Sequence, residues 1–148
     1  MTTVQKNNVR RLRKGFTLME ILVAVAIVGM LVGLAVTNVG KILGEGQEFS
    51  AKTMVNDSMK TALLNYRLAM GDYPSTEEGL KALITAPEGK QDRWRGPYVE
   101  AKGGALPLDP WGAAYQYSYP GVKNTESYDL FSVGRDKAPD TADDIGNW

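Results

Sequence analysis

The stretch that decides the fold is Lys14-Gly15-Phe16-Thr17-Leu18-Met19-Glu20-Ile21-Leu22, which opens a long apolar segment. The 25 residues from Phe16 to Gly40 carry one charged side chain, that of Glu20. As a helix that rises about 1.5 Å per residue, they would extend roughly 37 Å, enough to cross a hydrocarbon layer of about 30 Å. The sequence therefore predicts a membrane-spanning helix over residues 16–40.

The distribution of charge predicts the orientation of this helix. The chain of 148 residues has 17 basic and 17 acidic side chains, but no acid precedes residue 16. The basic residues of this leader are Lys6, Arg10, Arg11, Arg13 and Lys14, so the rest of the chain carries a formal charge of −5. Because short basic segments stay on the cytoplasmic side of a membrane, we expect residues 1–15 inside and residues 41–148 outside.

The composition excludes several classes of function. The chain has no cysteine and no histidine, which rules out disulfides, thiolate nucleophiles, cysteine-ligated metals and histidine-based triads. Ser132 precedes Val133 and Gly134, but Leu130 stands where a Gly-x-Ser-x-Gly elbow needs its first glycine. Arginines and aromatics alternate in residues 93–98, yet two arginines in an acidic domain are a poor footprint for phosphate. We predict that the protein is not an enzyme and that it has no nucleic-acid partner.

Two other kinds of leader compete with a retained membrane helix. A secretory signal peptide would need a small-residue cleavage site after its apolar run, and residues 37–40 make a weak one. Arg10-Arg11 suggests a twin-arginine signal, although such pairs are frequent in basic leaders. Neither alternative gives Glu20 a role.

Glu20 is the informative residue of the apolar segment. An ionised carboxylate in lipid costs about 2.5 to 3.5 kcal/mol on insertion scales, so it normally implies a partner. The alternative is that Glu20 reaches the headgroups from the end of the helix. Gly29 and Gly33 likewise have two interpretations, either as a Gly-x-x-x-Gly contact between helices or as ordinary glycines of a membrane helix.

The residues from Lys14 to Leu22 resemble the class III leader junction of type IV pilins and type II secretion pseudopilins. The resemblance implies that a prepilin peptidase cuts between Gly15 and Phe16 and that Phe16 becomes an N-methylated terminus. It also implies that Glu20 is the assembly carboxylate, which neutralises the Phe16 amine of a neighbouring subunit. Family members often have proline where this chain has Thr37, so we expect no proline-induced break there.

The sequence beyond the apolar segment predicts a small α+β domain. Apolar residues recur with helical spacing at Val55, Met59, Ala62, Leu63 and Tyr66, and this helix should end at Gly71. Together with the membrane helix it would form a spine from about Thr17 to Ala69. Glycines at 40, 44 and 46 weaken the helix between the two halves.

Shorter elements should cover the second half of this spine. Residues 75–78 form a capping box before a short helix that Pro87 and Gly89 stop, and residues 109–112 form a type I turn. Strands are predicted over residues 115–119 and 128–133, with a turn at residues 120–121. We expect a small antiparallel sheet that lies on the helix.

The C-terminal tail is rich in aspartate, with Asp136, Asp140, Asp143 and Asp144 close together. On composition alone it is either a solvated acidic tail or a loop that holds Ca²⁺, which takes six to eight oxygen ligands from carboxylates, carbonyls and water. It is not an EF-hand, because the glycine and the closing glutamate of that motif are missing.

Nearly the whole chain after the leader resembles the major pseudopilins of type II secretion systems. The matching segments are Tyr66-Arg67, Gly71–Leu80, Arg95–Tyr98, Leu106–Gly112 and Asp143–Trp148. The resemblance implies a Ca²⁺ site with Asp136, Asp143 and Asp144 as carboxylate ligands and Val133 as a carbonyl ligand. Asp140 stands where the family varies.

The resemblance implies a type IV pilin-like α+β fold. Its parts would be a removed leader (residues 1–15), a transmembrane and assembly helix (16–40) and a periplasmic head (41–148). The protein would be a single-pass protein of the inner membrane and polymerise into a periplasmic pseudopilus that drives export of folded proteins across the outer membrane. Its partners would be copies of itself, the prepilin peptidase, minor pseudopilins and the inner-membrane assembly platform.

Two other functions stay open on the sequence. The first is the major subunit of a type IV pilus, although many such pilins close their C-terminal loop with a disulfide and this chain has no cysteine. The second is a membrane-anchored module that binds calcium through the acidic loop.

Overall fold

The computed structural model describes residues 15–148, except for the side chains of Thr37 and Asn38. The chain divides into two compact units, Met1–Lys41 and Ile42–Trp148. The predicted leader therefore lies outside the described residues apart from Gly15.

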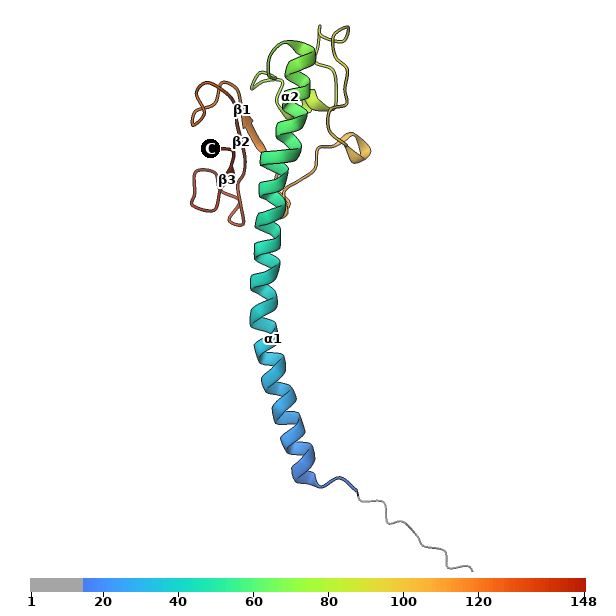
Figure 1. The fold of residues 1–148 in the computed structure, drawn as a ribbon, viewed down its shortest axis with the longest axis vertical. Helices are drawn as coiled ribbons and strands as arrows, with labels where there is room; N and C mark the ends of the chain where they lie inside the picture. The colour runs from blue at the N-terminus through green and yellow to red at the C-terminus, as the bar shows by residue number, and fades with distance from the viewer. Residues whose placement is uncertain (1–14) are drawn as a thin grey trace, which may run out of the picture. The chain divides into compact units, whose positions relative to one another are not determined.

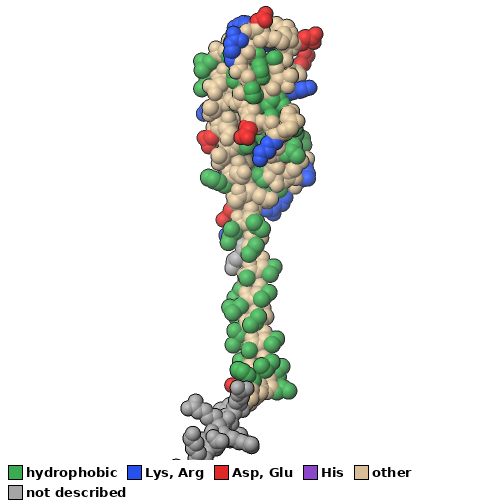
Figure 2. All heavy atoms as spheres, turned by 90° about the vertical axis from the view of Figure 1, so that its right-hand side faces the viewer, with side chains coloured by type: hydrophobic (Ala, Val, Ile, Leu, Met, Phe, Trp, Pro, Cys, Tyr) green, Lys and Arg blue, Asp and Glu red, His purple; other side chains and the backbone are tan. Residues whose placement is uncertain are grey.

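The long helix α1 extends over Leu18–Thr53. Every described side chain from residue 16 to residue 36 is exposed, and Figure 2 shows hydrophobic side chains along this helix. The helical run is long and apolar enough to cross a membrane, by length and composition. The helix continues through Gly40, Gly44 and Gly46, so three weak helix formers do not break it.

A π-helical turn over Met54–Ser58 links α1 to the helix α2, which covers Met59–Met70. The predicted apolar face is confirmed, because its five residues are at most 2% exposed. Helix α2 ends where expected: Gly71 has a φ of 96° and donates its N–H to the carbonyl of Arg67 at 2.7 Å. This left-handed conformation favours glycine and closes the last helical turn.

Three short strands form an antiparallel sheet in the order β1-β2-β3. Strands β1 (Gln116–Ser118) and β2 (Asp129–Ser132) lie within the predicted segments but are shorter. They pair with Tyr117 opposite Leu130, and Ser132 of β2 pairs with Ile145 of β3. Strand β3 (Ile145–Gly146) was not predicted, because two residues carry no readable alternation.

The segment between α2 and β1 is mostly irregular. The capping box forms as predicted, since the N–H of Ser75 donates to Glu78 and the N–H of Glu78 donates to the Ser75 hydroxyl. It is followed by a 3₁₀ helix over Leu80–Leu83, not by an α-helix. Gly79, with φ 56° and ψ −166°, lies outside the helical region and interrupts the first turn.

The predicted turn at residues 109–112 is confirmed. The N–H of Gly112 donates to the carbonyl of Asp109 at 2.9 Å, which is the closing bond of a β-turn. The segment of residues 93–98 is a packed loop, as expected. The indole of Trp94 donates to the carbonyl of Ala82 at 2.8 Å, and its ring meets that of Tyr98 edge to face.

The hydrophobic core lies where the sheet and the irregular segment pack on the helix. Figure 1 shows the strands on one side of α2 and the irregular segment on the other. Fully buried side chains come from all three parts, such as Leu63 of α2, Leu83 of the 3₁₀ helix and Leu130 of β2. Tyr66 lies among them, and burial raises the pKa of its phenol to about 12. Its ring contacts Tyr98 edge to face with the ring centres 5.6 Å apart.

Candidate functional site

The first candidate site is the start of α1, where Thr17 and Glu20 form a capping box. The hydroxyl of Thr17 accepts the N–H of Glu20 at 3.2 Å, and Glu20 Oε2 accepts the N–H and the hydroxyl of Thr17 at 2.9 and 3.0 Å. This reciprocal pattern satisfies donors that a helix start leaves free. It also explains why α1 begins at Leu18 and leaves Gly15 and Phe16 outside the helix.

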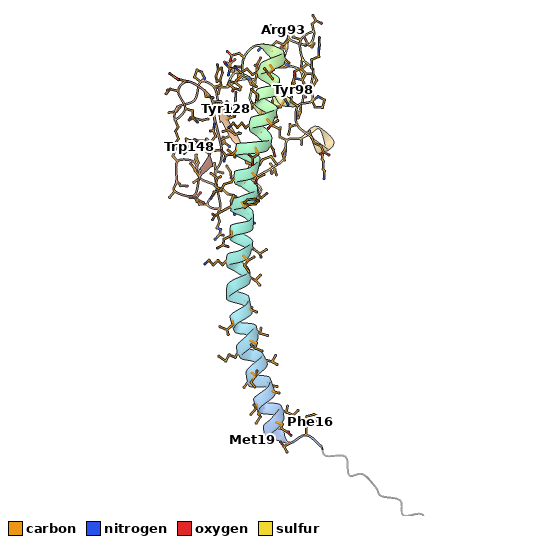
Figure 3. The ribbon with its side chains drawn as sticks, in the orientation of Figure 1. Phe16, Met19, Arg93, Tyr98, Tyr128 and Trp148 are labelled. Atoms are coloured by element: carbon orange, nitrogen blue, oxygen red, sulfur yellow. The ribbon has the colours of Figure 1, made fainter. Side chains whose placement is uncertain are left out.

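The residues around this capping box are exposed to solvent. Phe16 is 83% exposed and Met19 is 75% exposed, and Figure 3 shows both at the beginning of α1. All three hydrogen bonds of the capping box leave Glu20 Oε1 unused, and within residues 15–148 we find no cation in contact with this carboxylate. The negative charge of Glu20 is therefore held in position by hydrogen bonds but is not neutralised by the described residues.

The second candidate site is the acidic loop, residues 133–144, which connects β2 to β3. Asp143 lies between the loop's own donors: its Oδ1 accepts the hydroxyl of Thr141 at 2.7 Å, and its Oδ2 accepts the N–H of Asp136 at 3.1 Å. These hydrogen bonds lower the pKa of Asp143 to about 2, and the bond from the Thr141 hydroxyl has the largest effect. The carboxylate is therefore ionised at neutral pH.

Asp144 faces a different set of neighbours. Its Oδ2 accepts the N–H of Asp140 at 2.8 Å, whereas its Oδ1 is buried and lacks a hydrogen-bond partner among the described residues. A cavity of about 390 Å³ adjoins Asp143, Asp144, Arg135 and Trp111. The indole nitrogen of Trp111 is also buried without a partner among the described residues.

The structure brings only some of the predicted calcium ligands together. The backbone N–H of Asp136 donates to the carboxylate of Asp143, and Asp144 lies beside Asp143 on the same cavity. The carboxylate of Asp136 accepts the N–H of Ala138 at 2.9 Å within its own turn. Within residues 15–148, no three histidine, cysteine, aspartate or glutamate side chains converge closely enough to hold a metal.

Ser132 and Asp109 form a buried pair that the sequence did not indicate. The hydroxyl of Ser132 is 0% exposed and donates to Asp109 Oδ2 at 2.6 Å. The serine is therefore buried and engaged with a carboxylate. Thr17 was also missed, although Thr-x-x-Glu before an apolar run is a readable capping signal.

These features define a class of protein. A helix with one carboxylate near its N-terminal end, followed by a small α+β unit with a three-stranded sheet, is the organisation of a pilin-like subunit. A model of the prokaryotic N-terminal methylation motif matches residues 10–36, which contain the predicted cleavage point and Glu20.

Known proteins identify the family within this class. The family model of type II secretion system (T2SS) protein G matches residues 38–148. The type II secretion system core protein G of Pectobacterium carotovorum is 41% identical over 141 residues, which cover 92% of this chain and 85% of the relative. The namesake from Pseudomonas aeruginosa is 40% identical over 144 residues, with 94% and 97% covered. The chain belongs to the type II secretion system protein G family.

A solved structure agrees with this assignment. The fold is similar to the crystal structure of the major pseudopilin from the type 2 secretion system of enterohaemorrhagic Escherichia coli, with a TM-score of 0.60 and 34% identity. The similarity covers 71% of this chain and 85% of that one. The type IV pilin-like fold and the function as a structural subunit of the pseudopilus are thus confirmed, and the family is one of structural proteins.

Family membership also bears on partners and location. A subunit of the pseudopilus assembles with other components of the secretion system, and the methylation motif implies processing by a prepilin peptidase. The apolar helix α1 is consistent with anchoring in the inner membrane.

Proposed function

We propose that the protein polymerises through a charge pair between Glu20 of one subunit and the amine of Phe16 of the next. The observation that carries this proposal is a single carboxylate at the start of an exposed apolar helix, held by Thr17 and without a cation among the described residues. Leaving this charge in lipid costs a few kcal/mol, and so does leaving an ammonium there. Pairing them removes both costs, so association is favoured inside the membrane.

The amine exists only after processing. We infer that the peptidase cuts between Gly15 and Phe16 and that Phe16 is then methylated. The capping box supports this assignment, because it keeps Gly15 and Phe16 out of the helix, and both residues are exposed to solvent. Mass spectrometry of the protein extracted from membranes tests it: we expect a chain that starts at methylated Phe16. Retention of residue 1, or a cut near Gly40, would contradict the proposal.

Processing also changes the charge. Removing residues 1–15 removes all the cations of the basic leader and leaves a subunit with a formal side-chain charge of −5. We infer a topology with residues 1–15 in the cytoplasm, residues 16–40 in the inner membrane and residues 41–148 in the periplasm. The growing pseudopilus drives export of folded proteins across the outer membrane, together with minor pseudopilins and the assembly platform. The subunit itself supplies no catalytic step.

We propose that the acidic loop binds Ca²⁺. Two observations support the fit: Asp144 Oδ1 is buried without a hydrogen-bond partner among the described residues, and Asp143 is ionised beside it on the same cavity. Carboxylate oxygens are ligands of choice for this hard cation. Asp136, Asp143 and Asp144 would supply carboxylates and Val133 its carbonyl oxygen, with further oxygens from the backbone or water. Because the three carboxylates do not converge among the described residues, binding would require the loop to close around the ion. The bound ion would neutralise neighbouring aspartates and fix the loop.

Thermal melting of the full-length protein in detergent micelles tests the calcium site. We expect that a chelator lowers the Tm of the wild type and that Asp143→Ala lowers the Tm only when calcium is present. Asp92→Ala is the matched control, since Asp92 is exposed and distant in sequence from the acidic loop. If the chelator shifts the wild type no more than Asp143→Ala, the acidic loop is not the site.

A further inference from the structure

The acidic loop is held at its base by the buried carboxylate of Asp109, which lies outside the loop. Asp109 is 4% exposed and lies in the turn before β1. Its Oδ1 accepts the N–H groups of Trp111 at 3.0 Å and Ala113 at 2.7 Å, and its Oδ2 accepts the hydroxyl of Ser132 at 2.6 Å. Three donors therefore satisfy this carboxylate in the interior.

Ser132 links Asp109 to the acidic loop by hydrogen bonds. Since its hydroxyl donates to Asp109, its oxygen is free to accept, and it accepts the N–H of Gly134 at 3.1 Å. Ser132 is the last residue of β2 and pairs with Ile145, the residue directly after Asp144. One buried serine thus fixes both the first residues of the loop and the point where the loop returns to the sheet.

Gly134 carries the contact onward to Asp143. Its φ of 68° lies in the left-handed region, and a Cβ there would clash with the carbonyl oxygen of Asp143 and with its carboxylate. The backbone of Gly134 therefore lies directly against Asp143. The hydroxyl of Ser132 accepts the N–H of Gly134 and holds the Gly134 backbone in this position. The resulting chain of contacts runs from Asp109 through Ser132 and Gly134 to Asp143.

We propose that Asp109 and Ser132 are positioning residues for the acidic loop. They fix the two ends of the loop before the cation binds and so raise its affinity for calcium. This inference rests on the calcium site proposed above. Neither residue is a ligand, because the hydroxyl of Ser132 and both carboxylate oxygens of Asp109 are engaged inside the protein. A loop whose ends are already ordered loses less conformational entropy when it closes around an ion.

A matched control exists on the same strand. Asp129 at the start of β2 is also 4% exposed and also accepts three donors, the N–H groups of Val122, Lys123 and Asn124. It fixes the connection between β1 and β2 rather than the acidic loop. Asp109→Asn and Asp129→Asn thus make the same chemical change at equally buried positions. Only Asp109 is linked, through Ser132, to the start of the acidic loop.

The test is isothermal titration calorimetry, in which calcium chloride is added to the full-length protein in detergent micelles. Ser132→Ala leaves Asp109 Oδ2 and the Gly134 N–H without their partner, and Asp109→Asn sets an amide against three donors. For each variant we expect the Kd for calcium to rise about tenfold, the factor that corresponds to one lost hydrogen bond to a charged group. Asp129→Asn should leave this Kd within about twofold of the wild type, on the expectation that distant sites act independently.

Hydrogen exchange in the presence of a chelator supplies a second readout. Ser132→Ala should speed the exchange of residues 133–144 without metal, and Asp129→Asn should not. Unchanged calcium affinity in Ser132→Ala, or an equal loss in Asp129→Asn, would overturn the positioning role while leaving the calcium site intact. If the wild type binds no calcium, the proposed site itself fails, and the positioning role fails with it.

Discussion

Glu20 Oε2 accepts two hydrogen bonds from Thr17, one from its backbone N–H at 2.9 Å and one from its hydroxyl at 3.0 Å. The carboxylate proposed to act between subunits is thus held by the residue that precedes its own helix, and Glu20 is the third residue of α1. Both donors are neutral, so they fix the carboxylate without cancelling its charge. The proposed intermolecular pair therefore meets a carboxylate that is already oriented.

Thr17→Val should loosen the start of α1. The substitution removes the hydroxyl that accepts the N–H of Glu20, and loss of such a cap costs about 1 kcal/mol. We expect the Glu20 amide of the full-length protein in micelles to exchange about fivefold faster by NMR. Thr17→Ser retains the hydroxyl and should exchange like the wild type. Equal exchange in Thr17→Val and the wild type would show that the capping box does not hold the helix start.

Leu63→Ala should destabilise the unit of residues 42–148, whereas Leu68→Ala on the same helix should not. Leu63 is fully buried, and truncating such a leucine costs about 2 to 5 kcal/mol. Leu68 is 76% exposed, and surface changes usually stay within about 0.5 kcal/mol. Urea unfolding of the full chain in micelles measures both. The fluorescence signal comes from this unit because all three tryptophans, Trp94, Trp111 and Trp148, belong to it. Similar losses in the two variants would contradict the assigned core.

Lys123→Met should loosen the C-terminus. The ammonium of Lys123 lies 3.5 Å from the centre of the Trp148 ring, and the ring of Phe131 lies 5.4 Å from that of Trp148. A cation over an exposed aromatic face contributes about 0.5 to 1 kcal/mol, so we expect a loss of that size in urea unfolding. Lys123→Arg preserves the cation and should lose less. A larger loss in the arginine variant than in Lys123→Met would show that the charge over the ring is not the stabilising contact.

Asp129→Asn should flatten the acid limb of the stability curve. Burial opposes ionisation of Asp129, but the N–H groups of Lys123, Asn124 and Val122 outweigh it and lower the pKa of the carboxyl. A lowered pKa in the folded state contributes stability that is present above the unfolded value of about 3.9 and is lost as the pH falls through the folded value. The Tm of the wild type should therefore fall more steeply than that of the variant below about pH 4. Parallel curves would mean that Asp129 does not gain stability from its ionised form.

The parts of the fold that depend on neighbours in sequence could be predicted. The apolar segment and the spacing from Val55 to Tyr66 predict α1 and α2, because helical periodicity is local. The turn at residues 109–112 follows from Asp, Pro and Gly at fixed offsets. The 3₁₀ helix was predicted as an ordinary helix because the backbone of Gly79 could not be read from its sequence.

The contacts that complete the candidate sites join residues far apart in the chain. Ser132 and Asp109 are separated by 23 positions. The side chain of Asn147 accepts the N–H of Leu130 of β2, 17 positions back, and the backbone N–H of Asn147 donates to the carbonyl of Leu130. No spacing rule links such pairs, so β3 and the anchor of the acidic loop had to come from the structure. The aspartates of the loop were evident in the sequence, but which oxygen is left without a partner depends on how the loop folds.

The pairing of Glu20 with the amine of Phe16 is tested most directly by the assembly of Glu20→Gln in cells that carry the complete secretion system. Filaments would be quantified by shearing and sedimentation, and the mature N-terminus would be determined by mass spectrometry in the same samples. We expect normal processing to Phe16 and a loss of filaments, because the amide cannot neutralise the neighbouring amine. Glu77→Gln, at an exposed position outside α1, should assemble normally. Normal filaments from Glu20→Gln would show that subunits do not assemble through a charge pair between Glu20 and Phe16.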